Sequence, residues 1–149
     1  MKEISIFVDE SGDFGEYNHI SPFYIEKKNM QDITEATGKL SKQIGNWIKN
    51  NYDMLLPYDT VKIYYDNGQV ELSRILASVF NVLLPSVETK KVIPSDYRLF
   101  QVADFICSMK LLELKKENHN MSIQEQRFFG GEEGLNKNYI KDLKKWELE

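Results

Sequence analysis

The stretch that decides the fold is Ile4-Ser5-Ile6-Phe7-Val8-Asp9-Glu10-Ser11-Gly12-Asp13. In its first half every second residue is aliphatic, which is the pattern of a strand with one buried face. The strand ends at Asp9 and a turn follows at Ser11-Gly12, so three acidic side chains collect at its carboxyl end. In open α/β sheets this is the edge at which ligands and metals bind. Neighbouring carboxylates repel one another and favour a bound cation. An acidic, solvated turn is the simpler alternative, because Asp and Gly are common turn residues.

Length and composition indicate one globular domain, residues 1–149, with a single core. The formal net charge of −4 provides no basic field for nucleic acid. Carboxylates that hold a metal ion reverse the sign of the charge locally, so a nucleic-acid partner stays compatible with the sequence. The single cysteine, Cys107, lies in an apolar helical pattern, which favours a packing role and a reducing compartment. No segment resembles a membrane span or a signal peptide, so we expect a cytoplasmic location and no membrane partner.

The rest of the chain alternates between strand and helix patterns. This order predicts an α/β domain with a sheet flanked by helices. The long helix near the end is apolar nearly all round, which predicts that it is buried on the sheet. The expected elements are a strand within 22–27, a helix capped by Asp32 with apolar positions from Ile33 to Ile48, a strand at 61–66, a helix at 72–83, a strand within 87–93, a helix capped by Ser95 with apolar positions from Leu99 to Leu114, and a short helix capped by Ser122.

A second strand also ends in an acid, because Asp66 follows the run at 61–65 and Gly68 comes two residues later. If this strand lies parallel to the first, Asp9 and Asp66 emerge at one edge of the sheet. Asp104 lies on the long helix, with Gln101 one turn earlier on the same face. An Asp in so apolar a segment is costly to bury unless it is paired or bound to metal. Capping a loop or accepting backbone hydrogen bonds is the alternative role for Asp104.

Four blocks of the sequence resemble, in the same order, the bacterial and phage family known as domain of unknown function 3800, whose fold is related to ribonuclease H. The resemblance covers nearly the whole chain. It implies a mixed sheet flanked by helices that begins with an antiparallel meander. The segment between residues 15 and 60 is short, so we expect this meander to be shortened or incomplete, and no glutamate from the first helix is assigned to the site. The blocks are Val8-Asp9-Glu10-Ser11-Gly12-Asp13-Phe14-Gly15, Tyr64-Tyr65-Asp66-Asn67-Gly68-Gln69, Asp96-Tyr97-Arg98-Leu99-Phe100-Gln101-Val102-Ala103-Asp104 and Phe128-Phe129-Gly130.

By this resemblance Asp9, Asp66 and Asp104 are the metal ligands of a nuclease. Two Mg²⁺ or Mn²⁺ ions would hydrolyse a phosphodiester bond of DNA or RNA. Hard cations of this kind prefer carboxylate oxygens, and the chain lacks the Cys and His sets that zinc prefers. Three more residues belong to the expected site with less defined roles: Glu10, Asp13 and Gln101, the last of which would orient Asp104 or touch the substrate.

Two other functions compete with this interpretation. A catalytically degenerate member of the same fold would bind nucleic acid or a protein without cleaving it. The segment Asp9-x-Ser11-Gly12-Asp13 is also similar to the nucleophile loop of haloacid-dehalogenase-like phosphatases, but those enzymes want an acid where this chain has Ser11. The Lys-rich segment 137–145, which Asp142 interrupts, is either a solvated helix face or a patch that contacts phosphates.

Overall fold

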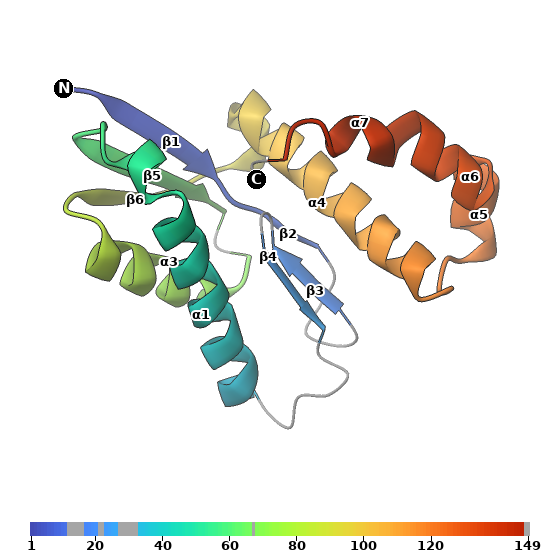
Figure 1. Cartoon of the computed structure of the whole chain (residues 1–149), viewed down its shortest axis with the longest axis horizontal. Coiled ribbons are helices and arrows are strands. Elements are labelled where there is room, and N and C mark those ends of the chain that lie inside the picture. The colour runs from blue at the N-terminus through green and yellow to red at the C-terminus, as the bar shows by residue number, and fades with distance from the viewer. Residues whose placement is uncertain (12–16, 21–22, 27–32, 67, 148–149) are drawn as a thin grey trace.

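The fold combines a parallel sheet, helices on its face and a helical extension at its carboxyl-terminal end (Figure 1). The structure is a computed structural model, which describes residues 1–11, 17–20, 23–26, 33–66 and 68–147. The parallel sheet has the strand order β1-β5-β6. Its strands are β1 (Glu3–Phe7), β5 (Thr60–Tyr65) and β6 (Val87–Lys91). Ile6 lies opposite Ile63, and Ile63 opposite Thr89. The predicted α/β architecture is therefore confirmed.

Antiparallel strands form a second sheet rather than part of one mixed sheet. They are β2 (Glu10–Ser11), β3 (Tyr17–Ile20) and β4 (Phe23–Glu26), in the order β2-β3-β4. The expectation of a single mixed sheet was therefore wrong for the described part of the chain. The reason is a change of partner within one continuous segment. The amide of Val8 still donates to the carbonyl of Tyr64 at 2.9 Å, whereas from Glu10 onward the chain pairs with β3.

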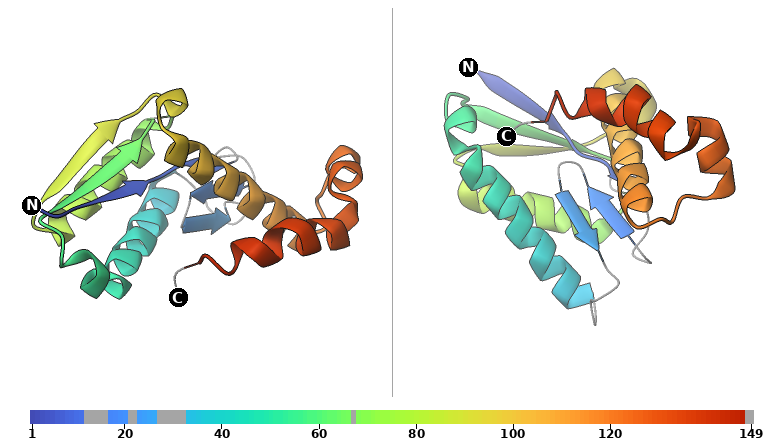
Figure 2. Two further views of the ribbon diagram at one scale, coloured as in Figure 1. Left: turned by 90° about the horizontal axis from the view of Figure 1, so that it is seen from above. Right: turned by 45° about the vertical axis from the view of Figure 1, so that its right-hand side comes forward.

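Two helices cover one face of the parallel sheet, as Figures 1 and 2 show. They are α1 (Ile33–Asn50) and α3 (Val70–Leu83), and the short helix α2 (Tyr52–Leu55) follows α1. Their buried residues recur every three or four positions, so each helix turns one apolar side toward the sheet. The predicted helices at 33–48 and 72–83 are confirmed, whereas Asp32 lies outside the described residues. The fully buried part of this core includes Leu40, Ile44, Ile48, Ile63, Tyr65, Leu72, Leu76 and Phe80.

The opposite face of the parallel sheet is largely polar. Lys62 pairs with Glu3 across two strands at 2.6 Å, and Lys90 pairs with Glu88 at 2.9 Å. Near the carboxyl end of this face the rings of Phe7 and Tyr64 stack with centroids 4.7 Å apart, and Tyr97 packs against both. Side chains alternate between faces along β5, so Tyr64 lies on this polar face while Tyr65 points into the core.

The long helix α4 (Arg98–Glu117) differs from its prediction in its N-cap residue and in the burial of its side chains. The 3₁₀ turn η1 (Pro94–Asp96) precedes it, and the extended residue Tyr97 occupies the N-cap position. Ser95 lies inside that turn, so the prediction that it caps the helix was wrong. The prediction of burial all round was wrong as well, because the first half of α4 packs on one side only. Three apolar side chains there are 60%, 46% and 45% exposed: Leu99, Val102 and Phe105.

The carboxyl-terminal helices pack on the second half of α4 (Figure 2). They are α5 (Ile123–Phe129), α6 (Gly131–Leu135), the π-helical turn η2 (Asn136–Ile140) and α7 (Lys141–Leu143). Ser122 and Glu125 form a capping box, which confirms Ser122 as the predicted cap of α5. Gly130 ends α5 with φ of 72°, a conformation that glycine adopts without strain. These helices and α4 share a second apolar cluster of Met109, Leu112, Met121, Leu135, Ile140 and Leu143.

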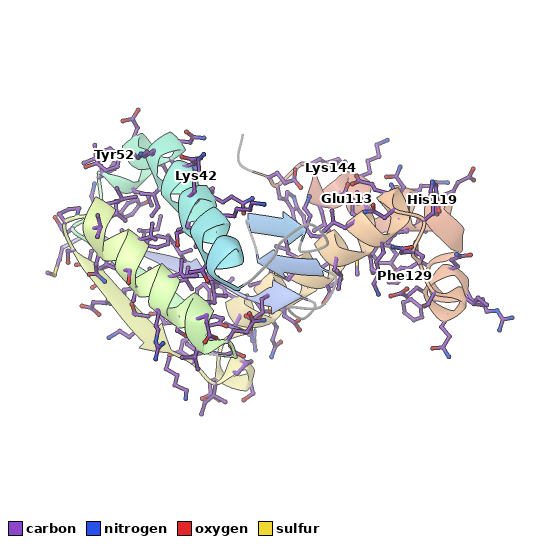
Figure 3. All side chains as sticks on the ribbon, turned by 90° about the horizontal axis from the view of Figure 1, so that it is seen from below. Lys42, Tyr52, Glu113, His119, Phe129 and Lys144 are labelled. Carbon is purple, nitrogen blue, oxygen red and sulfur yellow. The ribbon has the colours of Figure 1, made fainter. Side chains whose placement is uncertain are left out.

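An ion-pair network around one buried acid joins the end of the chain to α4. Glu113 is buried, and its two oxygens accept hydrogen bonds from Lys144 at 2.8 Å and from Lys110 at 3.1 Å (Figure 3). Lys110 also pairs with Glu147. Burial alone would raise the pKa of Glu113, but the hydrogen bonds from the two lysines outweigh it and leave that pKa below its ordinary value of 4.5.

We expect Glu113→Gln to lower the free energy of unfolding by about 1–3 kcal/mol at pH 7, because it leaves two lysines without their buried partner. The folded-state pKa of Glu113 is depressed, so its contribution is present above about pH 4.5 and is lost as the pH falls through the folded-state pKa. Urea denaturation at pH 7 and pH 3 measures both values, with the exposed Glu133→Gln as the control. An equal loss at the two pH values would contradict the ion-pair explanation.

Candidate functional site

The site is centred on Asp9, which lies where the chain passes from β1 to β2. Asp9 is only 7% exposed, although it is an acid. Its backbone carbonyl accepts a hydrogen bond at 3.0 Å from the thiol of Cys107, which is fully buried on α4. The backbone amide of Glu10 donates to its carboxylate. Asp9 is thus held at the contact between the strand end and α4.

The pKa of Asp9 is strongly raised. Burial, together with the smaller effects of the charges of Asp104, Glu10 and Asp66, raises this pKa from 3.8 to about 7, and the hydrogen bond from the Glu10 amide opposes the rise. Asp9, Asp66 and Asp104, the three predicted ligands, therefore share one electrostatic environment, and Glu10 belongs to it too. Asp66 approaches from the end of β5, and Asp104 from an exposed position on α4.

Glu10 takes part in a hydrogen-bond network that crosses three elements. Its Oε1 accepts a hydrogen bond at 2.9 Å from the hydroxyl of Tyr65. That hydroxyl in turn accepts one at 2.8 Å from the backbone amide of Gln69, the N-cap residue of α3. The second oxygen of Glu10, Oε2, is buried and has no hydrogen-bond partner among the described residues. Burial raises the pKa of Glu10, and the Tyr65 hydrogen bond opposes this rise.

Gly68 brings the start of α3 against these carboxylates. Its backbone amide donates to Oδ1 of Asp66 at 2.7 Å. A Cβ atom on this residue would lie 2.7 Å from Oε1 of Glu10 and 3.2 Å from Oδ1 of Asp66. Real side chains do not tolerate the first of these distances, so only glycine leaves room for Glu10 in its present position.

The donor chemistry of the site fits a hard divalent cation. Four carboxylates concentrate negative charge, and Oε2 of Glu10 is buried with no hydrogen-bond partner in the described part of the chain. The thiol of Cys107 donates to a backbone carbonyl. Over the described ranges, however, no group of three or more His, Cys, Asp or Glu side chains is arranged so that it could hold a metal ion. A cation would therefore have to draw these carboxylates together as it binds.

The remaining predicted site residues differ in where they lie. Asp13 falls outside the described residues. Gln101 is exposed on α4, one turn before Asp104, and its role beside Asp104 stays a prediction.

Tyr65 was not among the predicted site residues. The alternation of the strand does indicate that Tyr65, immediately before Asp66, points into the core. Alternation does not reveal which group the buried hydroxyl of Tyr65 contacts.

No family model matches the chain, and the comparisons with curated proteins and with solved structures give no match either. The family resemblance inferred from the four sequence blocks thus stays a prediction. Among the described residues, no helix is long and apolar enough to cross a membrane.

Proposed function

We propose that the protein is a divalent-metal-dependent nuclease with a ribonuclease H-like fold. The observation that carries this proposal is Asp9, a buried acid surrounded by the charges of three more carboxylates. Such crowding of like charges is unfavourable in a folded protein unless a proton or a cation relieves it. Perturbed carboxylates at a strand end are typical of functional sites rather than of packing sites.

The path of the chain also supports the proposal. A ribonuclease H-like fold begins with a three-stranded antiparallel meander. Here the segment from Glu3 to Ser11 pairs with β5 through its first part and with β3 through its second, so that three antiparallel strands directly follow the first parallel one. In this proposal β2, β3 and β4 would stand for that meander, and the two-residue strand β2 would be its shortened part.

The side chains have distinct tasks in this proposal. Bound Mg²⁺ or Mn²⁺ would supply an activated water and stabilise the charge that develops on the leaving oxygen. Asp9, Asp66 and Asp104 would hold the ions, in deprotonated form. Because the pKa of Asp9 is about 7, protons compete with the cation below neutral pH, and metal affinity should rise as the pH rises through 7.

A binding module of the same fold is the second candidate. It is favoured by the lack, in the described part of the chain, of a preformed set of three metal-holding side chains. The aspartate-nucleophile phosphatase has less support, because a nucleophile must reach its substrate and Asp9 is only 7% exposed.

The test is a cleavage assay of the full chain on single- and double-stranded DNA and RNA, with Mn²⁺, with Mg²⁺ and with chelator. We expect cleavage of at least one substrate with metal and none with chelator. Binding of nucleic acid without cleavage of any substrate would favour the binding module. Cleavage that persists in chelator would overturn the metal-dependent mechanism.

A further inference from the structure

The hydroxyl of Tyr65 joins three parts of the fold. Tyr65 ends β5 immediately before Asp66, and it is only 1% exposed. Its hydroxyl donates to Oε1 of Glu10 on β2 and accepts from the amide of Gln69 at the start of α3. The neighbouring Tyr64 points to the other face of the sheet and stacks on Phe7 instead.

Packing alone does not require this hydroxyl. A phenylalanine would fill the same space in the core, and a buried hydroxyl lowers stability unless its hydrogen bonds are satisfied. Both hydrogen bonds of the Tyr65 hydroxyl are made. Burial raises the pKa of Tyr65, which is the direction that keeps its hydroxyl protonated as a donor to Glu10.

The carboxylate of Glu10 is held from two sides. Tyr65 binds its Oε1, and the absence of a side chain on Gly68 leaves the space that this oxygen occupies. The other oxygen, Oε2, is buried and unpartnered within the part of the chain that the structure describes. Holding one oxygen of a carboxylate while the other has no protein partner is the usual arrangement of a ligand with a supporting hydrogen bond.

We propose that Tyr65 is a positioning residue of the carboxylate site, which holds Oε1 of Glu10 so that Oε2 is available to a divalent cation. This inference rests on the proposed function, because it assumes that the site takes such a cation. It adds Glu10 to the residues that contact the ion, and it makes Tyr65 act on cation affinity only through Glu10.

The experiment measures the dissociation constant of Mn²⁺ for the full chain by titration, without substrate. Tyr65→Phe removes only the hydroxyl, and we expect it to weaken Mn²⁺ binding by about tenfold, the usual effect of losing a supporting hydrogen bond to a ligand. Glu10→Gln should weaken binding at least as much. The double variant should be no weaker than Glu10→Gln alone, because Tyr65 acts through Glu10. The matched control is Tyr64→Phe, the same change on the opposite face, which should leave the dissociation constant unaltered.

The outcomes separate this inference from the function it rests on. A Tyr65→Phe variant that binds Mn²⁺ as tightly as wild type would overturn the role of Tyr65 but not the metal site. Additive losses of Mn²⁺ affinity in the double variant would do the same. A wild-type chain that binds no Mn²⁺ would overturn the proposed function itself. If Tyr65→Phe unfolds, Glu10→Gln provides the test, because Tyr65 acts on the ion only through Glu10. Unchanged Mn²⁺ binding in a folded Glu10→Gln variant would then contradict the proposal.

Discussion

Asp66→Asn is expected to lower metal-dependent cleavage by at least about 100-fold while leaving the fold intact. The substitution keeps the shape of the side chain and removes its charge. The hydrogen bond from the Gly68 amide survives, because an asparagine Oδ1 accepts it as the carboxylate does. Asp66 follows the last residue of β5 and is not part of the apolar core. Cleavage therefore falls because the ion is lost, not because the protein unfolds.

The assay compares wild type and Asp66→Asn side by side on the cleaved substrate, at saturating Mn²⁺. Asp59→Asn is the matched control, because Asp59 is exposed at the opposite end of β5, where it accepts a hydrogen bond from the backbone of Lys2. Binding of nucleic acid in metal-free buffer should hold or improve in Asp66→Asn, since one charge that repels phosphates is gone. Equal cleavage by the two proteins would show that Asp66 is not a catalytic ligand.

Asp9→Asn is expected to stabilise the metal-free protein at pH 8 by up to about 4 kcal/mol. The pKa of Asp9 in the folded state is about 7, above the ordinary value of 3.8, so between these values the folded protein binds more protons than the unfolded one. The free energy of unfolding of wild type therefore falls as the pH rises from about 4 to 7. The upper limit of this fall follows from 1.36 kcal/mol for each pH unit between the two pKa values. An asparagine does not titrate, so the variant should lack this fall.

The same variant should lose most of its response to metal. Mn²⁺ at millimolar concentration should raise the melting temperature of wild type, more at pH 8 than at pH 6, because it binds the deprotonated folded state. Asp9→Asn and Asp104→Asn should blunt this rise, whereas Asp59→Asn should not. Thermal melts with and without Mn²⁺ at both pH values provide the measurement. If Mn²⁺ does not change the melting temperature of wild type, the result would favour the binding module over the nuclease.

Local patterns were sufficient for most of the secondary structure. The alternation at residues 4–8 and at 61–65 predicted the neighbouring strands β1 and β5, because each has one face in the core. The helical spacing from Ile33 to Ile48 predicted α1 for the same reason. The start of α4 was missed because Pro94 and Ser95 satisfy the usual signals of a helix start, yet the local backbone forms a 3₁₀ turn first.

The parts of the site that depend on tertiary contact could not be predicted. The sequence places an acid after each of the strands β1 and β5, but it does not say that the Glu10 side chain meets the Tyr65 hydroxyl across 55 residues. The apolar composition of α4 also does not say which side of this helix packs against the rest of the protein. Leu99, Val102 and Phe105 look like core residues in the sequence and are exposed, because α4 crosses the strand end and does not lie flat on the sheet.

The contact between Cys107 and Asp9 also makes the site depend on two segments that are remote in the sequence. It joins residues that are 98 positions apart, whereas α1 and α3 meet the strands of the parallel sheet over shorter loops. Long loops close late, since their ends must first find each other at a cost in chain entropy. The site is therefore complete only once α4 has docked on the end of β1 and has brought Asp104 to Asp9 and Asp66.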